Sequence, residues 1–194
     1  MLNEPEYTTA SHLNIPELLS KNQYASIKIL RFMDVMLEEV EKRQFVSKEH
    51  LVIGLLDRVK ENWEKDYSWL TIELCVDEKI RFTLPEDIIT VIFDNLILNS
   101  VQQNEQRDSL KVTIDINLSG ELLYVRYKDN GVGLPEKYKN APMTILEPHE
   151  TSREKGHGLG MWIVNNTLEM SGGEVIDIVD DAGFGIQFTI GGRL

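Results

Sequence analysis

The chain has 194 residues, with 20 lysine and arginine side chains against 32 aspartate and glutamate side chains, so its formal net charge is −12. At roughly 100–200 residues per domain, this length predicts one full domain with at most a small extension. The acidic balance argues against broad electrostatic binding to nucleic acid or to an anionic membrane. A single cysteine, Cys75, excludes an intrachain disulfide and a cysteine-rich zinc site.

No apolar stretch approaches the roughly 18–20 residues needed to cross a bilayer. The first residues have neither a basic region nor an apolar core of the kind found in secretory signals. The sequence therefore predicts a cytoplasmic segment without membrane contact of its own, whose parent protein could carry an anchor elsewhere.

Residues 1–46 are expected to form a polar N-terminus and a helical extension. From Ile15 to Phe45, apolar residues recur at spacings of three and four, which predicts a helix. The apolar stripe is wider than that of an ordinary surface helix. Two interpretations remain open, packing within the chain and a homodimer contact through residues 15–45.

Residues 47–194 are expected to form the main domain. Helices are predicted over residues 47–66, 86–103 and 159–170, and strands over residues 70–76, 79–83, 112–118, 122–128, 174–179 and 184–190. Thr83 to Glu86 reads as a capping box with Pro85 in the first turn, and the strand at 79–83 as the hairpin partner of the strand at 70–76. Helices and hairpin-connected strands segregate along the chain. The predicted fold class is therefore α+β, a two-layer sandwich of one mostly antiparallel sheet packed by helices on one face, with an N-terminal helical extension.

Three polar patches stand out, and the first lies on the helix at 86–103. Asn95, Asn99 and Gln102 follow one another at i, i+4 and i+7 and so share an edge of the helix. Carboxamide oxygens can ligate a hard cation such as Mg²⁺, and carboxamide nitrogens can donate to phosphate. The alternative interpretation is that these residues mark the solvent face.

The second patch is Asp129-Asn130-Gly131-Val132-Gly133, where a strand ends at an acidic residue. A carboxylate there can accept a hydrogen bond from an exocyclic amine, and the glycines let the backbone pass close to a flat ring. A simple turn with Asn130-Gly131 at its tip is the alternative.

The third patch, Gly156-His157-Gly158-Leu159-Gly160, leads directly into the helix at 159–170. A glycine-rich loop before a helix N-terminus presents free N–H groups to an anion such as phosphate. The alternative is a flexible hinge. The pattern lacks the Gly-Lys-Ser/Thr ending of a P-loop and the strand–helix–strand context of a dinucleotide fingerprint.

Together and in this order, the three patches resemble the ATP-binding domain of the GHKL superfamily, the Bergerat fold. They are most similar to the catalytic domain of a sensor histidine kinase. The stretch from Asn95 to Ser100 resembles the N box, Asp129 to Gly133 the G1 box, and Gly156 to Gly160 the G2 box. Ile145 to Pro148 resembles a degraded F box, and the resemblance covers about residues 47–194.

The resemblance implies a role for each matching position. Asn99 would ligate Mg²⁺ with the help of Asn95, and Asp129 would accept the adenine amine. Residues 135–155 would form a lid over the nucleotide. The remaining implied contacts are with the base for Gly131 and Gly133, and with the phosphates for Gln102, Arg153, Lys155, Gly156, His157, Gly158, Leu159 and Gly160. Gln102 and Gln103 stand where the family often has a basic residue and an aromatic. Either the affinity for phosphate would be lower, or Arg153 and Lys155 would supply the charge.

The implied function is that of a histidine protein kinase of a two-component system, which transfers the γ-phosphoryl group of ATP to a histidine. The implied cofactors are ATP and Mg²⁺. The implied partners are a histidine-bearing helical domain and a response regulator. None of the four histidines, His12, His50, His149 and His157, matches the phosphoacceptor motif, and the helices at 15–66 would then be the remnant of a dimerisation hairpin.

Two other functions remain open. A GHKL ATPase acting as a clamp is disfavoured, because Asn95 stands where hydrolytic members place a general-base glutamate. A degenerate nucleotide-sensing or protein-docking module is favoured by the missing acceptor histidine and by the F box, where Leu146 and His149 replace phenylalanines.

Overall fold

The structure is a computed structural model that describes residues 49–77, 79–150 and 158–191. The chain divides into two units, Met1–Gln44 and Phe45–Leu194, and every described residue belongs to the second. The predicted extension over residues 1–46, with its helix at 15–45, lies outside the described residues and stays a prediction.

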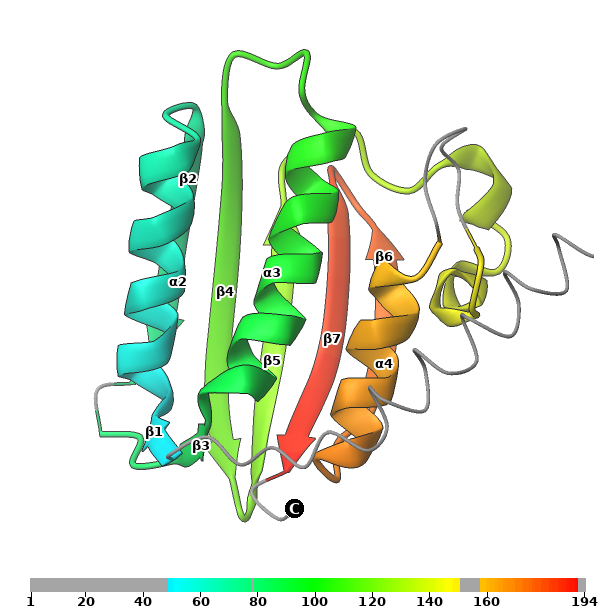
Figure 1. Cartoon of the computed structure of the whole chain (residues 1–194). Helices are drawn as coiled ribbons and strands as arrows, with labels where there is room; N and C mark the ends of the chain where they lie inside the picture. Colours follow the sequence, from blue (N-terminus) through cyan, green and yellow to red (C-terminus); the bar gives the residue numbers. More distant parts are fainter. Residues whose placement is uncertain (1–48, 78, 151–157, 192–194) are drawn as a thin grey trace, which may run out of the picture. The chain divides into compact units, whose positions relative to one another are not determined.

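Three helices cover one face of a five-stranded sheet, as Figure 1 shows. The helices are α2 (Val52–Asp66), α3 (Glu86–Gln103) and α4 (Gly160–Met170). The sheet has the strand order β2-β4-β5-β7-β6. Its strands are β2 (Leu70–Val76), β4 (Leu110–Ser119), β5 (Leu122–Asp129), β6 (Val175–Asp180) and β7 (Phe184–Gly191). All neighbours are antiparallel except β2 and β4, which are parallel. The predicted two-layer α+β class is confirmed.

The predicted hairpin between residues 70–76 and 79–83 is wrong. β2 pairs with β4, with Leu70 opposite Leu110, and a parallel pair of this kind needs a long crossover connection. The crossover here contains α3. Thr83 begins β3 (Thr83–Pro85), which pairs with β1 (Glu49–Leu51) in a separate two-stranded sheet.

This small sheet changes the start of α2 and the cap of α3 from those predicted. α2 begins at Val52, whose N–H donates to the Phe82 carbonyl at 3.0 Å, and the residues before it form β1. α3 begins after Pro85, which occupies the cap position without a side-chain hydrogen bond, so the predicted capping box does not form. Thr83 is held in strand pairing with Leu51 and is not available as a cap.

The apolar face of α3 forms the centre of the core. Ile88, Ile89, Ile92 and Phe93 are fully buried, as the sequence predicts for this face. The Phe93 ring lies 6.3 Å from that of Phe188 on β7. The helix is thereby fixed against the middle of the sheet, and its polar edge is left facing the side of α4.

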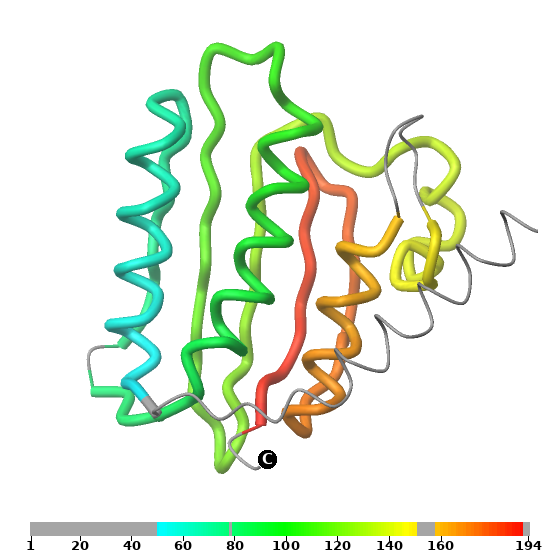
Figure 2. Tube along the Cα trace, in the orientation of Figure 1, coloured from blue at the N-terminus to red at the C-terminus, as the bar shows by residue number. Residues whose placement is uncertain are grey.

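The backbone trace in Figure 2 shows where the chain departs from this regular frame. After β5 it leaves the sheet near the C-terminal end of α3 and runs to the outer side of α4. This segment contains two short 3₁₀ turns, η1 (Glu136–Tyr138) and η2 (Pro142–Leu146). It corresponds to the described part of the predicted lid.

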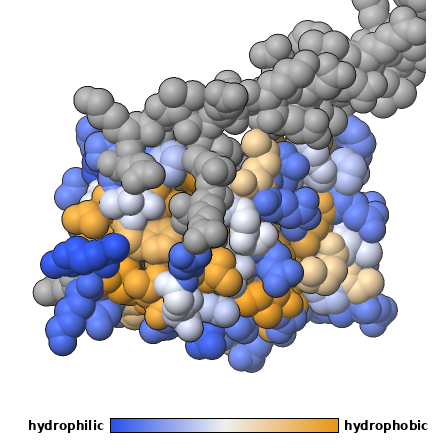
Figure 3. Space-filling view, turned by 90° about the horizontal axis from the view of Figure 1, so that it is seen from below, coloured by the Kyte–Doolittle hydropathy of each residue, from blue (hydrophilic) through white to orange (hydrophobic). Residues whose placement is uncertain are grey.

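The opposite end of the domain carries β1, β3 and the turn between β4 and β5. Figure 3 views the molecule from this end, where hydrophobic side chains of the described residues lie in several separate areas among hydrophilic ones. Leu51 and Leu118 are among the exposed large hydrophobic residues. The three polar patches of the sequence are not part of this end, because β5 finishes and α4 begins at the other one.

Candidate functional site

Asp129 is the last residue of β5 and is only 3% exposed. Its Oδ1 accepts hydrogen bonds from the backbone N–H of Gly131 at 2.8 Å and of Phe184 at 3.0 Å. Its Oδ2 accepts from the Ser100 hydroxyl at 2.5 Å. A carboxylate offers about four acceptor positions, so these three donors fix its orientation and leave one position on Oδ2.

Ser100 is held from its other side by Tyr127. The two oxygens are 2.8 Å apart, and Tyr127 is fully buried. Burial raises the pKa of the Tyr127 phenol well above its usual range, so the phenol keeps its proton. Because the hydroxyl of Ser100 donates to Asp129, Tyr127 donates to Ser100.

The loop after Asp129 is fixed to the sheet and to the end of α3. The N–H of Asn130 donates to the Lys111 carbonyl at 3.0 Å, and its side-chain oxygen accepts from the Lys111 N–H at 2.8 Å. Buried Asn104, just after α3, accepts from the Val132 N–H at 3.0 Å and donates to the Ser100 carbonyl at 2.7 Å. This loop is therefore preformed by hydrogen bonds on both sides.

The turn between β6 and β7 closes the loop from the far side. Gly133 has φ +77°, and a Cβ there would overlap the carboxylate of Asp180. The Asp180 Oδ1 also accepts from the Leu134 N–H at 2.9 Å. At Gly183, with φ +130°, a Cβ would overlap the Asp129 carbonyl. Glycine is needed at both positions, because the positive φ and the neighbouring atoms both disfavour a Cβ.

Asn95 and Asn99 meet the start of α4 at Gly160. A Cβ on Gly160 would lie 3.2 Å from the Asn95 Oδ1 and 3.5 Å from the Asn99 Nδ2. The Asn95 Nδ2 donates to the Val91 carbonyl one turn earlier at 2.7 Å, which turns its oxygen toward Gly160. Two patches 60 residues apart in the sequence thus come together in the fold.

The other predicted phosphate contacts lie around this point or outside the described residues. Gln102 is half-buried on α3, one turn beyond Asn99, and Leu159 is the cap residue of α4. Gly158 has φ +66°, and a Cβ there would overlap the backbone of His149. The predicted residues outside the description are Arg153, Lys155, Gly156 and His157.

Asp94, the neighbour of Asn95, faces another helix. The indole N–H of Trp63 on α2 donates to its Oδ1 at 2.7 Å. This contact connects α2 to α3 and directs the carboxylate away from Gly160. Asp94 therefore does not supply a carboxylate in place of the amide of Asn95.

The described part of the lid packs against the domain. Tyr138 and Leu146 are buried in the hydrophobic core, so leucine fills the place in which the sequence resemblance expects phenylalanine. Glu150 accepts from Lys137 at 2.8 Å and from the Tyr138 hydroxyl at 3.3 Å. The Lys137 ammonium lowers the pKa of the Glu150 carboxyl. His149, the other replacement, is exposed.

Sequence reasoning did not find three residues of this site. Ser100 lies on α3 and Asn104 directly follows this helix, at positions where polar side chains would ordinarily face solvent, but both are buried. Asp180 lies 51 residues after Asp129 and reaches the loop only through the β6–β7 hairpin. Ser100 could have been found from its position. It follows Asn99 directly and lies on the side of the helix that faces the strand ending at Asp129.

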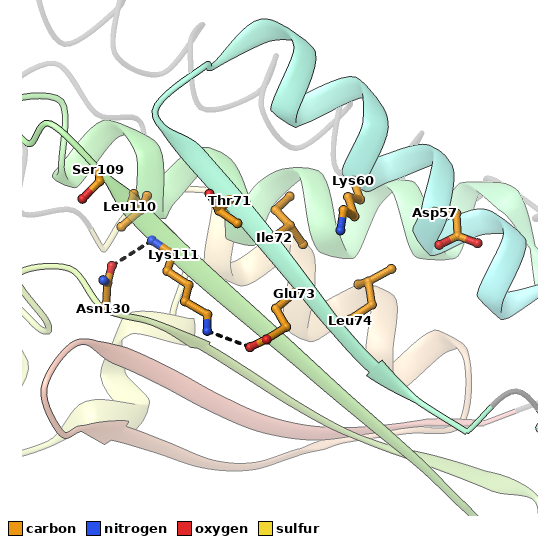
Figure 4. A pocket seen from close by; sticks show the side chains of 10 residues that line it. All are labelled: Asp57, Lys60, Thr71, Ile72, Glu73, Leu74, Ser109, Leu110, Lys111 and Asn130. Carbon is orange, nitrogen blue, oxygen red and sulfur yellow. Dashed lines mark hydrogen bonds and ion pairs between the residues drawn. The ribbon is translucent and has the colours of Figure 1, made fainter.

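A groove at the edge of the sheet is separate from these residues, apart from Asn130. Figure 4 shows Lys60 and Asp57 of α2 along one side, and Thr71, Glu73 and Lys111 of β2 and β4 along the other. The Lys111 ammonium pairs with Glu73 at 2.8 Å. Because both charges are already paired, the groove offers no free charge from this pair.

The described residues hold neither a cluster of typical metal ligands nor a helix suited to span a membrane. They contain no group of three or more histidine, cysteine, aspartate or glutamate side chains that could hold a metal ion. Across the described part of the chain, none of the helices combines the length and apolar character that a membrane span requires. Any metal at Asn95 and Asn99 would therefore be held by amide oxygens together with oxygens of a ligand.

Curated relatives of this chain include a sensor histidine kinase and a nitrogen regulation protein. The chain is 24% identical over 187 residues to the sensor histidine kinase WalK of Bacillus subtilis, which covers 90% of this chain and 30% of WalK. It is 33% identical over 129 residues to the nitrogen regulation protein NtrY of Azorhizobium caulinodans, covering 61% of this chain and 16% of NtrY. The chain thus spans less than a third of the length of these relatives.

Solved structures share the fold. A mycobacterial sensor histidine kinase MprB matches with a TM-score of 0.61 at 19% identity, covering 76% of this chain and 99% of that one. A nucleotide-free catalytic domain of histidine kinase ThkA matches with a TM-score of 0.61 at 22% identity, covering 75% of this chain and 95% of that one. Residues 85–191, more than half of the chain, match the family described as histidine kinase-, DNA gyrase B-, and HSP90-like ATPase. The chain belongs to this family.

Proposed function

We propose that residues 47–194 are the ATP-binding catalytic domain of a sensor histidine kinase and transfer the γ-phosphoryl group of ATP to a histidine on a helical partner domain. The observation that carries the proposal is the Asp129 carboxylate, which is buried, fixed by three donors and left with one acceptor position. The names of the curated relatives and the family match support the same activity.

In this proposal, Asp129 and the loop that follows it recognise the base. The remaining acceptor position on Oδ2 suits the 6-amino group of adenine, which donates, and not a 6-oxo group, which accepts. Gly131 and Gly133 keep Cβ atoms out of a loop that is already in close contact with Asn104 and Asp180. The two glycines therefore let Asn104 and Asp180 hold the loop in place beside the proposed base site.

The phosphates would bind at the junction of α3 and α4. Asn95 and Asn99 present carboxamides to the first turn of α4, where free backbone N–H groups favour an anion. Mg²⁺ would enter with the phosphates and neutralise their charge, with Asn99 and Asn95 as amide-oxygen ligands, a donor type that suits this cation. The predicted contacts of Gly156, Gly158 and Gly160 with the phosphates belong to the same proposal.

Transfer to another group is better supported than hydrolysis. An amide such as Asn95 cannot accept a proton at neutral pH, and Asp94 is bound to Trp63 on the other side of the helix. Positioning and charge neutralisation are the main requirements of phosphoryl transfer, and the residues of the junction suit both. These observations disfavour the alternative of an ATPase clamp.

The acceptor histidine and the response regulator would be supplied by partners. His50 lies in β1 beside Glu86, at 3.9 Å, and His149 lies in the lid, so neither is on a helix. A histidine-bearing helical domain, in the parent protein or in a partner molecule, fits this arrangement. A homodimer through residues 15–45 would bring two copies of that domain together.

Calorimetric titration of ATP with and without Mg²⁺ tests the nucleotide site. The wild-type chain and Asp181→Asn, which changes an exposed carboxylate, should bind ATP in a Mg²⁺-dependent manner, whereas Asp129→Asn should lose most of the binding. Transfer of radiolabelled phosphate to an added histidine-bearing helical domain then tests the kinase activity. ATP binding without transfer would support a degenerate sensing module, and absence of ATP binding would contradict the proposal as a whole.

A further inference from the structure

The contacts of Ser100 extend the proposed function to the choice of base. Ser100 is 3% exposed and lies between two buried side chains, the carboxylate of Asp129 at 2.5 Å and the phenol of Tyr127 at 2.8 Å. Both hydrogen bonds go to residues of β5, so neither is made within α3, the helix that carries Ser100. A buried serine between a phenol and a carboxylate needs a reason beyond packing, because each buried polar group requires a partner.

The direction of these hydrogen bonds is determined by chemistry. A carboxylate only accepts, so the one proton of the Ser100 hydroxyl is used on Asp129. The oxygen of Ser100 must then accept, and Tyr127, protonated because it is buried, is the donor. The three groups form a chain in which every proton has one position.

This chain controls the oxygen that remains free to recognise a base. Oδ1 already accepts from two backbone N–H groups, those of Gly131 and Phe184. Only Oδ2 has room for a further donor, and its orientation is set by Ser100. The Tyr127 ring also lies 6.4 Å from the ring of Phe184, the residue whose N–H donates to Oδ1.

We propose that Ser100, supported by Tyr127, is a positioning residue that fixes Asp129 Oδ2 as an acceptor for a single donor and so sets the preference of this site for a 6-aminopurine. The proposal rests on the proposed function, because it assumes that the base meets Asp129. Without Ser100, the carboxylate would keep its backbone donors but lose the contact that directs Oδ2. Only the interaction with the ligand group that contacts Oδ2 would then be weakened.

The test compares two ligands that differ only in that group. ADP and purine riboside 5′-diphosphate, which lacks the 6-amino group, are titrated calorimetrically into the full chain and its variants. The wild type should prefer ADP. Ser100→Ala should weaken ADP binding about tenfold, as expected for a hydrogen bond to a charged group, while the affinity for the analogue changes by less than about twofold.

Three further variants separate positioning from a general loss of structure. Tyr127→Phe keeps the ring and removes the hydroxyl, and should lower the preference for ADP in the same direction by a smaller factor. Ser100→Thr retains a hydroxyl and should restore the preference. Ser171→Ala removes another buried serine hydroxyl, one that donates to the Leu168 carbonyl, and should leave the preference at the wild-type value.

The outcomes distinguish this inference from the function on which it rests. An equal loss of ADP and analogue binding in Ser100→Ala, or no change in either, would overturn the positioning role while ADP binding by the wild type leaves the proposed function standing. No binding of ADP by the wild type would overturn both. Thermal unfolding of each variant shows whether it is folded under the conditions of the titration.

Discussion

The carboxamide of Asn104 occupies the place that a Cβ on Gly131 would take. Asn104 is buried, and its two hydrogen bonds, to the Ser100 carbonyl and from the Val132 N–H, prevent it from moving aside. The end of α3 and the loop after β5 are thus fitted to each other at one contact. The loop after β5 therefore depends on the cap residue of α3, which is not among the residues expected to contact a ligand.

Gly131→Ala should displace this loop. The new methyl group must push away Asn104 or shift the backbone, and we expect a loss of about 1–3 kcal/mol in the free energy of unfolding together with weaker ATP binding. Gly54→Ala is the matched control, because a Cβ there meets no atom within 4 Å and the residue lies on the exposed side of α2. The control should gain up to about 1 kcal/mol from helix propensity. Urea unfolding of both variants measures the change in the free energy of unfolding. Similar changes at the two sites would contradict the expectation.

Gly183→Ala should separate the β6–β7 turn from Asp129. Gly183 has φ +130° and a Cβ would overlap the Asp129 carbonyl, whereas Gly120 has φ +64° and open space around it. Gly120→Ala should cost about 1 kcal/mol for its backbone conformation. Gly183→Ala should cost about 1–3 kcal/mol more, because it adds a steric overlap. Equal destabilisation of the two variants in chemical unfolding would show that the turn does not depend on this contact.

Trp63→Phe should loosen α2 from α3. The change removes the 2.7 Å hydrogen bond to Asp94 and should lower the free energy of unfolding by about 1–3 kcal/mol, the range for a bond to a charged group. Trp69→Phe is the control, since Trp69 is also half-buried but has no hydrogen bond from its indole among the described residues. If both variants lose equal stability, ring size and not the bond to Asp94 accounts for the effect.

Asp94→Asn tests whether the Asp94 carboxylate acts as a base in phosphoryl transfer. The amide retains an oxygen that can accept from Trp63, so the fold should be kept. Because Asp94 faces α2 and not Gly160, the rate of phosphoryl transfer should remain within about twofold of wild type. A loss of several orders of magnitude in transfer assays would assign Asp94 a role as a base and contradict the orientation described here.

The lid contact at Glu150 should depend on pH. The hydrogen bond from the Lys137 ammonium lowers the pKa of the Glu150 carboxyl below its usual range. A carboxyl with a lowered pKa in the folded state stabilises the fold above its unfolded pKa, and this contribution is lost as the pH falls through the lowered value. An NMR titration of the carboxyl should give a midpoint below 4.5 in the wild type, and a higher midpoint in Lys137→Gln. An unchanged midpoint in that variant would contradict the ion pair.

The local periodicities of the sequence predicted much of the fold. The alternation in residues 112–118 and 184–190 and the apolar stripe of α3 correspond to β4, β7 and the buried helix face. Such periods reflect which side of an element is buried, a property that each segment carries by itself. The same holds for the glycines of the loop after Asp129, whose composition indicated a close approach of the backbone.

Only the tertiary structure decided how these segments combine. The parallel pairing of β2 with β4, the small sheet of β1 and β3, and the loss of the capping box at Thr83 all depend on partners far away in the sequence. The chain from Tyr127 through Ser100 to Asp129 has the same origin, since a helix residue meets the strand that follows it by 29 residues. Local propensity cannot specify such contacts, because burial of α3 against the sheet selects them. The sequence thus indicated most of the elements and several residues of the candidate site, and the packing of α3 determined which oxygen of Asp129 keeps an unused acceptor position.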